Sequence, residues 1–380
     1  MRNKSLKLLA FAAAIILLFG IFGCKAKETP QQTTETEPTA APTDAPEEVY
    51  EEVFASWSDN APALDTLIEY IETITDESSP DFIPVDRRIA VFDMDGTIYA
   101  ELFPTYLEYY MLAWRILADP TFEPDEELIA VAEEIRAGGP THTYASDMAL
   151  KHANAAARAY AGMTVTEFAN YVTTILVRDA DGFEGMTYGQ AFYRPIIEVI
   201  DYLMENDFSV YVVSGSDRYI CRALFEGMVD IPSENFIGMD VALEASGQGD
   251  TDALDYTFQP TDELVRTDRL QVKNLKTNKV TAIMREIGKQ PVLSFGNTSG
   301  DTAMHLYTIS NNPYKGLAFM LIADDDVRDY GHPEKADGLR EKWENLGFNV
   351  ISMANDFKTI YGEKVRKTGT FRWTEELSGR

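Results

Sequence analysis

The chain has 380 residues, 45% of them apolar, and carries a formal net charge of −29 at pH 7, from 33 Lys and Arg against 62 Asp and Glu. That apolar share can fill a sizeable core, which excludes a mainly disordered chain. The acidity argues against a nucleic-acid partner, because binding to a phosphate backbone needs clustered basic side chains. Two cysteines are too few for a disulfide framework.

The first 24 residues have the layout of a bacterial export signal. Three basic residues within the first seven precede an uncharged run that ends in Ile21-Phe22-Gly23-Cys24. The run is short for a membrane span and typical of a secretory signal. Its ending resembles a lipobox, so we expect residues 1–23 to be removed as a lipoprotein signal peptide and Cys24 to be lipidated. The mature chain would then lie outside the cytoplasm, anchored to the cell membrane only by its lipid. An uncleaved anchor is the alternative.

Residues 24–48 are rich in Thr, Pro and Glu and contain almost nothing apolar, which predicts a disordered tether. The folded region is expected to begin near Val49 with an amphipathic helix over residues 49–76. The second cysteine, Cys221, is predicted to be a small buried side chain at the start of a helix.

Apolar runs that stop at polar loops recur along the chain and predict β-strands. Three of them, Ile89–Phe92, Phe208–Val213 and Val292–Phe295, end at loops rich in Asp, Ser, Gly or Asn. Helices are expected from Arg194 and from about Val280, and this alternation predicts an α/β fold, a parallel sheet with helices on both faces. Ligands in such sheets bind beyond the carboxyl ends of the strands, so the three loops are expected to converge on one site. Two further strands and a helix between them are predicted over residues 317–323, 348–352 and 334–346.

Residues 98–193 are too many for a single crossover between strands. Four segments within them have helical composition, at residues 102–117, 124–136, 145–161 and 164–177. We therefore predict a helical cap inserted over the strand ends. The α/β core would be formed by the flanking residues 49–97 and 194–380.

The first polar loop brings two carboxylates together. Asp93 and Asp95 lie two residues apart at a strand end, so both side chains face one space. Two like charges this close are costly unless a cation neutralises them. With Asn297 and Asp301 from the third loop the donors are all oxygen, which favours Mg²⁺ over zinc.

A carboxylate nucleophile beside Mg²⁺, with a second carboxyl as acid and base, suits phosphoryl transfer through an aspartyl-phosphate. The second loop offers donors for phosphate oxygens in the Ser214 hydroxyl and the amides of Gly215 and Ser216. A lysine must offset the remaining negative charge, and Lys279 is the best placed. Its rivals are Lys273 and Lys276.

These residues resemble the four motifs of the haloacid dehalogenase (HAD) superfamily. Asp93-Met94-Asp95-Gly96-Thr97 is similar to the first motif, Val212-Val213-Ser214 to the second, Lys279 to the third and Gly296–Asp301 to the fourth. The resemblance implies a HAD-like Rossmannoid sheet with an inserted helical cap. It also implies that Asp93 is the nucleophile, that Asp95 is the acid and base and offers its backbone carbonyl to Mg²⁺, and that Thr97 belongs with the phosphate-binding residues.

One position departs from the family's pattern. The fourth motif usually begins Gly-Asp, and here it is Gly296-Asn297. Asparagine can still bind a metal through its carbonyl oxygen, but one charge is lost, so weaker metal binding is expected, and Asn297→Asp is expected to tighten it. Asp301 is then either a direct ligand or a residue that orients the ligands.

The insert is similar to the helical cap of phosphoserine and phosphocholine phosphatases. The likeness implies a small phosphorylated metabolite as substrate, ammonium-bearing esters included, with Glu101 as a candidate to bind the ammonium group. Aromatic residues near Glu101 could form a cage for such a cation, and packing within a cap helix is their alternative role. They are Tyr99, Phe103, Tyr106, Tyr109, Tyr110 and Trp114.

The sequence thus predicts a Mg²⁺-dependent phosphomonoester hydrolase, tethered to the cell surface, that acts on a small-molecule phosphate ester. Two alternatives use the same fold. One is a catalytically weak, lipid-anchored binding protein, suggested by Asn297. The other is a phosphotransferase that passes the phosphoryl group to an acceptor other than water.

Overall fold

A seven-stranded sheet organises the part of the chain that the computed structural model describes, residues 53–378. The predicted signal peptide, Cys24 and the tether lie outside the described residues. The strand order is β5-β4-β3-β1-β6-β7-β8, and all neighbours are parallel except β4 and β5, which are antiparallel. The strands are β1 (Ile89–Phe92), β3 (Ser209–Asp217), β4 (Phe236–Ala245), β5 (Leu264–Val272), β6 (Leu293–Gly296), β7 (Leu317–Ile322) and β8 (Asn349–Ser352).

The predicted α/β class is confirmed, with two differences in the strands. The antiparallel pair β4 and β5 was not predicted, since β5 alternates charged and apolar residues and does not resemble a buried strand. The expected loop at Ser214-Gly215-Ser216 is instead the irregular end of β3. There the register against β4 shifts between Val213 and Asp217.

Helices cover both faces of the sheet because strand side chains alternate between the faces. Ala90 and Phe92 of β1 belong to a core that includes the apolar sides of α2 (Pro62–Thr75) and α7 (Arg194–Glu205). Their neighbour Val91 packs instead with residues of α9 and α10. The remaining helices of the core are α8 (Arg218–Phe225), α9 (Thr277–Glu286), α10 (Thr302–Ile309), α11 (Ala336–Glu344) and α12 (Met353–Asp356).

The helix predicted over residues 49–76 is interrupted in the structure. Residues 49–52 lie outside the described residues, and α2 begins only at Pro62, where proline suits the first helical turn. Upstream, Trp57 forms an isolated β-bridge with Phe357 instead of a helical turn. The described residues also contain five short 3₁₀ helices: η1 (Val85–Arg87), η2 (Gly139–Thr141), η3 (Tyr188–Gln190), η4 (Ser233–Asn235) and η5 (Pro333–Lys335).

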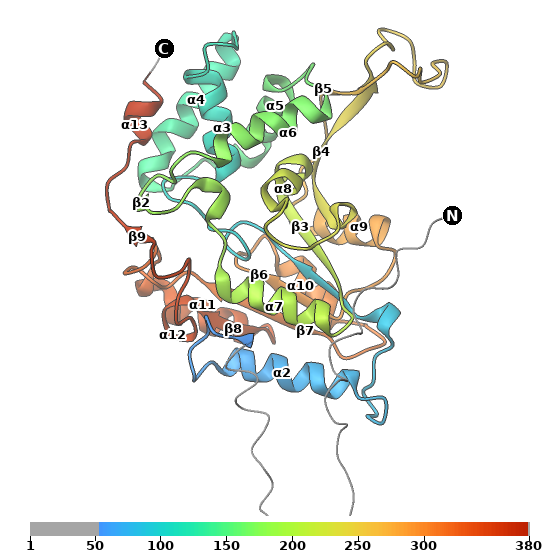
Figure 1. Ribbon diagram of the computed structural model, residues 1–380, viewed down its shortest axis with the longest axis vertical. Helices are drawn as coiled ribbons and strands as arrows, with labels where there is room; N and C mark the ends of the chain where they lie inside the picture. The colour runs from blue at the N-terminus through green and yellow to red at the C-terminus, as the bar shows by residue number, and fades with distance from the viewer. Residues whose placement is uncertain (1–52, 379–380) are drawn as a thin grey trace, which may run out of the picture. The chain divides into compact units, whose positions relative to one another are not determined.

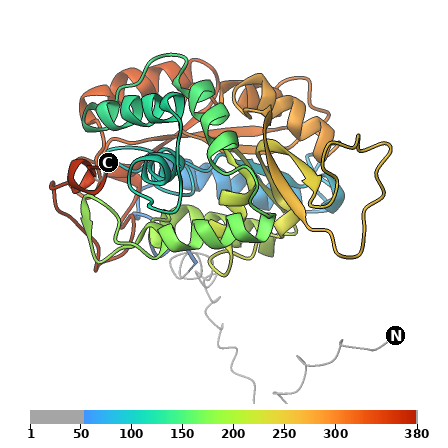
Figure 2. The same ribbon diagram turned by 90° about the horizontal axis from the view of Figure 1, so that it is seen from above.

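Four helices lie in the stretch between β1 and α7, as predicted from composition. Figure 1 shows them grouped on the side of the sheet away from α2, and Figure 2 looks down on them. The last of them begins at a reciprocal capping box between Thr164 and Glu167. The helices are α3 (Leu107–Leu117), α4 (Glu126–Gly138), α5 (Met148–Ala159) and α6 (Val165–Leu176).

The C-terminal segment returns to these insert helices, although the prediction assigned it to the core. Strand β9 (Arg366–Lys367) pairs with β2 (Phe183–Glu184), which follows α6, and α13 (Trp373–Glu376) ends the described chain. Trp373 is buried, and its indole N–H donates to the carbonyl of Arg136 in α4 at 2.9 Å. The C-terminal residues 366–376 therefore form a strap, which contacts the insert rather than the sheet.

No helix within residues 53–378 is long and apolar enough to cross a bilayer. Cys221 is buried in α8, as predicted, with a free thiol.

Candidate active site

The carboxyl ends of β1, β3 and β6 and the first turn of α3 surround a cavity of about 240 Å³. Most of the predicted site residues meet there, from loops far apart in the sequence. Thr97, Ser214 and Glu101 are not among the residues that line it. The lining residues are Asp93, Asp95, Tyr106, Glu108, Tyr109, Ala149, Gly215, Ser216, Lys273, Leu275, Lys279, Asn297, Thr298, Gly300 and Asp301.

Asp93 follows directly after β1 and is held by its backbone N–H, which donates to the carbonyl of Phe295 at 2.9 Å. Lys279, at the start of α9, is 1% exposed and donates to Oδ1 of Asp93 and, at 2.7 Å, to Oδ1 of Asp301. The other oxygen of Asp93, Oδ2, is the one that Lys279 does not engage. Lys279 thus holds the position predicted for it, and its rival Lys273 pairs with Glu108 instead.

Burial and charge oppose each other in this cluster. Burial raises the pKa of Asp93 to about 7; the nearby Asp301 charge adds to the rise and Lys279 opposes it. Burial would also raise the pKa of Asp301, but Lys279 and His305 bring it below its usual range. Burial alone would lower the pKa of Lys279. The charges of Asp301 and Asp93 stabilise its protonated form and raise the pKa, so Lys279 remains charged.

Asp95 is arranged to hold a proton. Its Oδ2 accepts from the Ser216 hydroxyl at 2.7 Å, and its Oδ1 is buried with no partner among residues 53–378. Burial raises the pKa of Asp95 well above its usual range. Ser214 acts behind this contact, since its hydroxyl oxygen accepts from the backbone N–H of Ser216 at 3.0 Å. A protonated Asp95 can therefore donate through an oxygen that the protein leaves free.

In the third loop, after β6, the side-chain oxygens of Asp301 are bonded to the protein, whereas one oxygen of Asn297 is not. Both oxygens of Asp301 are occupied: Oδ1 accepts from Lys279, and Oδ2 accepts from the backbone N–H groups of Asn297 at 3.2 Å and Thr298 at 3.1 Å. The Asn297 amide donates to Oε2 of Glu101 at 3.0 Å. Its Oδ1 is buried and has no partner within the described part of the chain. Of the two candidate ligands, Asn297 offers the free oxygen.

The residues present fit a hard cation that takes few protein ligands. Residues 53–378 contain no group of three or more His, Cys, Asp or Glu side chains placed to hold a metal ion. The oxygens that suit Mg²⁺ are therefore the Asp93 carboxylate and the free Oδ1 of Asn297, together with the Asp95 carbonyl that the family resemblance implies. Mg²⁺ keeps several waters and needs only one or two carboxylates, so this donor set is sufficient.

The insert supplies a wall of the cavity that the sequence did not reveal. Oε1 of Glu108 accepts from Lys273 at 2.7 Å, and its Oε2 is buried with no partner in the described range. Burial would raise the pKa of Glu108, but Lys273 and His152 lower it. Glu108 is the only acidic residue in the apolar run 107–117, which is the one local signal that could have marked it.

The aromatic residues near Glu101 divide between packing and the cavity. Tyr99 and Tyr110 are buried, and their hydroxyls bond to the Tyr188 carbonyl at 2.7 Å and to Glu376 at 2.9 Å. Tyr106 and Tyr109 line the cavity beside Glu108. Two of the six rings are therefore placed to contact a substrate there.

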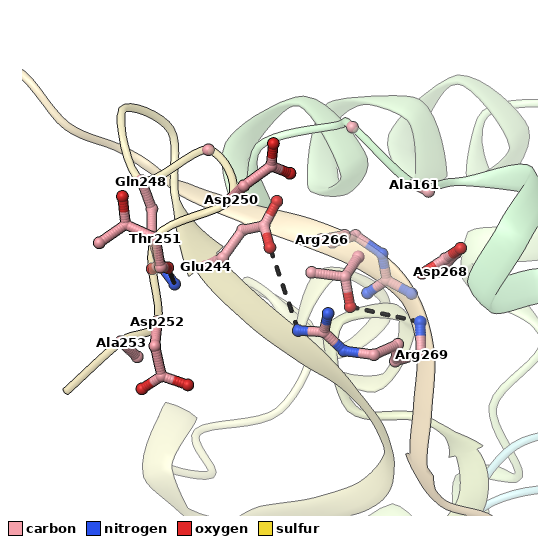
Figure 3. A pocket seen from close by; sticks show the side chains of 13 residues that line it. Ala161, Glu244, Gln248, Asp250, Thr251, Asp252, Ala253, Arg266, Asp268 and Arg269 are labelled. Atoms are coloured by element: carbon pink, nitrogen blue, oxygen red, sulfur yellow. Dashed lines mark hydrogen bonds and ion pairs between the residues drawn. The ribbon is translucent and has the colours of Figure 1, made fainter. Parts of the chain in front are cut away.

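A second, larger hollow of about 740 Å³ lies between the loop after β4 and the strand β5 (Figure 3). None of the predicted site residues lines it. Arg269 spans it with an ion pair of 4.0 Å to Glu244, and the buried Arg266 is committed to Asp217 at 2.6 Å. Four acidic residues line this hollow, Glu244, Asp250, Asp252 and Asp268, but no group of three such side chains within residues 53–378 is placed to hold a metal ion.

No protein-family model and no curated protein matches the sequence. Among solved structures, a conserved protein of unknown function from Anaerococcus prevotii is 12% identical over 78% of this chain and 92% of its own, with a TM-score of 0.49. A phosphoserine phosphohydrolase-like protein from Francisella tularensis is 14% identical over 69% and 94%, with a TM-score of 0.38. Cytosolic 5′-nucleotidase IIIB, bound to cytidine, is 11% identical over 76% and 87%, with a TM-score of 0.44.

Proposed function

We propose that the chain is a Mg²⁺-dependent phosphomonoester hydrolase of HAD type that acts through an aspartyl-phosphate on Asp93. The observation that supports this most is one cavity lined by Asp93 and Asp95, with Lys279 donating to Asp93 and Asp301 at its floor. The order of the four sequence motifs supports the same proposal.

In the first step, Oδ2 of Asp93 attacks phosphorus and the ester P–O bond breaks. Asp95 gives its proton to the departing alkoxide, for which its raised pKa and free Oδ1 suit it. In the second step, Asp95 takes a proton from water, the water oxygen attacks phosphorus, and the bond to Asp93 breaks. Gly215 lines the cavity and would offer its amide to a phosphate oxygen, whereas the Ser216 amide already donates to the Ser214 hydroxyl.

Asp93 and Asn297 would hold Mg²⁺, which would supply positive charge against the negative phosphate oxygens. Lys279 opposes the rise in the pKa of Asp93 that burial causes and orients its carboxylate for the attack. Asp301 orients Lys279 and fixes the backbone of the third loop through Asn297 and Thr298.

The substrate is a small ester with a cationic or hydrogen-bond-donating end. The cavity of about 240 Å³ is smaller than usual ligand pockets of roughly 300–1,000 Å³. Its insert wall offers the free Oε2 of Glu108 beside Tyr106 and Tyr109, which suits an ammonium group. Both oxygens of Glu101 are already engaged, by Tyr106 and Asn297, so Glu108 is the better candidate to bind it.

The test is a panel of phosphate esters incubated with purified protein, with and without Mg²⁺. We expect phosphate release that requires Mg²⁺, favours amino-bearing or trimethylammonium-bearing esters over sugar phosphates and nucleotides, and is abolished in Asp93→Asn. Trapping of ³²P on protein in the wild type but not in Asp93→Asn would support the covalent step. Appreciable turnover by Asp93→Asn would contradict it. New esters formed on adding alcohols would indicate phosphotransfer instead.

We also propose that the hydrolase faces the outside of the cell, attached through a lipid on Cys24. Labelled palmitate should enter the wild-type protein, and Cys24→Ala should lose the label while keeping its activity after purification. Labelling of Cys24→Ala would contradict the anchor.

A further inference from the structure

Both carboxylate oxygens of Glu101 are engaged by side chains of the protein. Its Oε1 accepts from the Tyr106 hydroxyl at 2.6 Å and lies 3.6 Å from Nε2 of His142. Its Oε2 accepts from the Asn297 side-chain amide at 3.0 Å. Both oxygens therefore have partners within the protein, and the side chain joins the insert to the third loop.

The chain packs closely around the contact between Glu101 and Asn297. Gly96 has a φ of +79°, a conformation that side-chain-bearing residues rarely adopt. A Cβ at this position would overlap the side chain of Asn297 and lie 3.0 Å from Oε2 of Glu101. Gly96 thus leaves the space in which the two side chains meet.

The contact decides which end of the Asn297 amide is left without a partner. An ionised carboxylate only accepts hydrogen bonds, so Glu101 must meet the NH₂ end of the amide. The carbonyl oxygen then lies on the other side, where Oδ1 is buried and has no partner among the described residues. A buried oxygen without a donor suits a cation.

We propose that Glu101 is a positioning residue that fixes the Asn297 amide with its oxygen toward the metal, so that Glu101 and Asn297 together replace the aspartate usual at this position. The inference rests on the proposed function only in taking Mg²⁺ as the metal. It assigns Glu101 a role different from ammonium binding. The negative charge absent from position 297 is supplied one hydrogen bond further away.

This arrangement predicts how the metal affinity changes in three variants. In Glu101→Gln, the new amide can donate to Oδ1 of Asn297 and turn the NH₂ group toward the metal, so binding weakens. In Asn297→Asp, two carboxylates meet where a 3.0 Å hydrogen bond was, so the added charge brings no gain. In the double variant, the amide introduced at position 101 donates to one oxygen of the carboxylate introduced at position 297. The second oxygen of that carboxylate then faces the metal, and binding recovers.

The experiment measures Mn²⁺ binding to the full chain by electron paramagnetic resonance of free Mn²⁺, and Mg²⁺ by competition, without substrate. We expect the dissociation constant to rise at least tenfold in Glu101→Gln, to stay equal or rise in Asn297→Asp, and to return to the wild-type value or below in the double variant. The exposed Glu123→Gln is the matched control for loss of one charge, and thermal midpoints check folding.

Wild-type affinity in Glu101→Gln, or additive effects of the two substitutions in the double variant, would overturn the inference. If Glu101→Gln alone fails to fold, the comparison of Asn297→Asp with the double variant still decides. Glu101 as an ammonium ligand would leave Mn²⁺ binding unchanged and would alter only the KM of ammonium-bearing esters. The experiment measures metal binding and not turnover. A lack of phosphatase activity would therefore refute the proposed function without affecting the test of Glu101.

Discussion

The two sides of the cavity pair their charged groups differently. The floor is formed by Asp93, Lys279 and Asp301, and the insert wall is formed by Glu108 with its partner Lys273. At the floor, Lys279 bonds to both Asp93 and Asp301, and the side chains come from strand ends and a core helix. At the wall, Glu108 shares one oxygen with Lys273 and leaves the other free. A floor whose groups hold one another suits a fixed reaction, and a wall with an open acceptor suits selection among leaving groups. Substitutions at the floor should therefore change kcat, and substitutions at the wall should change substrate preference.

Among variants that keep the nucleophile Asp93, the largest effect is expected at Asp95. Asp95→Asn keeps the contact with Ser216 but cannot carry the proton, so kcat should fall by a factor of about 10²–10⁴ for alkyl phosphates. A 4-nitrophenyl ester, whose leaving group needs no proton, should lose less in the first step. Stopped-flow release of nitrophenolate separates the two steps. An equal loss in the first step for both esters would argue against Asp95 as the acid.

Lys279→Met tests the ion pairs of the floor. It leaves two buried carboxylates facing each other, and we expect kcat to fall about 10²–10³-fold, as for loss of a charge-stabilising group. The free energy of unfolding should fall by about 3–5 kcal/mol, as when one partner of a buried ion pair is removed. Lys273→Met is the matched change at the wall, and it should alter KM more than kcat. The reverse pattern in the two lysine variants would break the distinction between floor and wall.

The floor was predictable from the sequence because its residues directly follow apolar runs. Asp93 and Asp95 come after β1 and Asn297 comes after β6, and neighbouring parallel strands bring such positions together. The wall was not predictable in this way. Glu108 and Lys273 are 165 residues apart and meet only because α3 packs over the end of the sheet.

The same reason explains the two largest differences in the fold. The strand β5 is recognisable mainly by its pairing with β4, and β9 is two residues long and exists through its pairing with β2. Local pattern cannot specify such partners. The strap formed by the C-terminal segment was missed for this reason, although its Trp373 is among the largest buried side chains.

Trp373→Ala tests whether the strap holds the wall in place. Removing this buried indole should lower the free energy of unfolding by about 3–5 kcal/mol. Trp343→Ala is the matched control, because Trp343 is equally buried but packs between α11 and the sheet. We expect both variants to lower the thermal midpoint and only Trp373→Ala to raise the KM of the preferred ester. Equal changes in KM would show that the strap has no special effect on the wall.

The smallest effect is expected from Glu108→Gln, which keeps the shape of the side chain and removes its charge. The free Oε2 of Glu108 is the acceptor that an ammonium group would meet, and a hydrogen bond to a charged group is worth about 1.5–3 kcal/mol. The ratio of kcat/KM for an ammonium-bearing ester to that for its uncharged isostere should therefore fall by a factor of about 10 to 150. Glu101→Gln should reduce both rates and leave this ratio unchanged, because we assign Glu101 to the metal side of the cavity. An unchanged ratio in Glu108→Gln would show that Glu108 does not bind the ammonium group. A collapse of the ratio in Glu101→Gln would assign the ammonium group to Glu101.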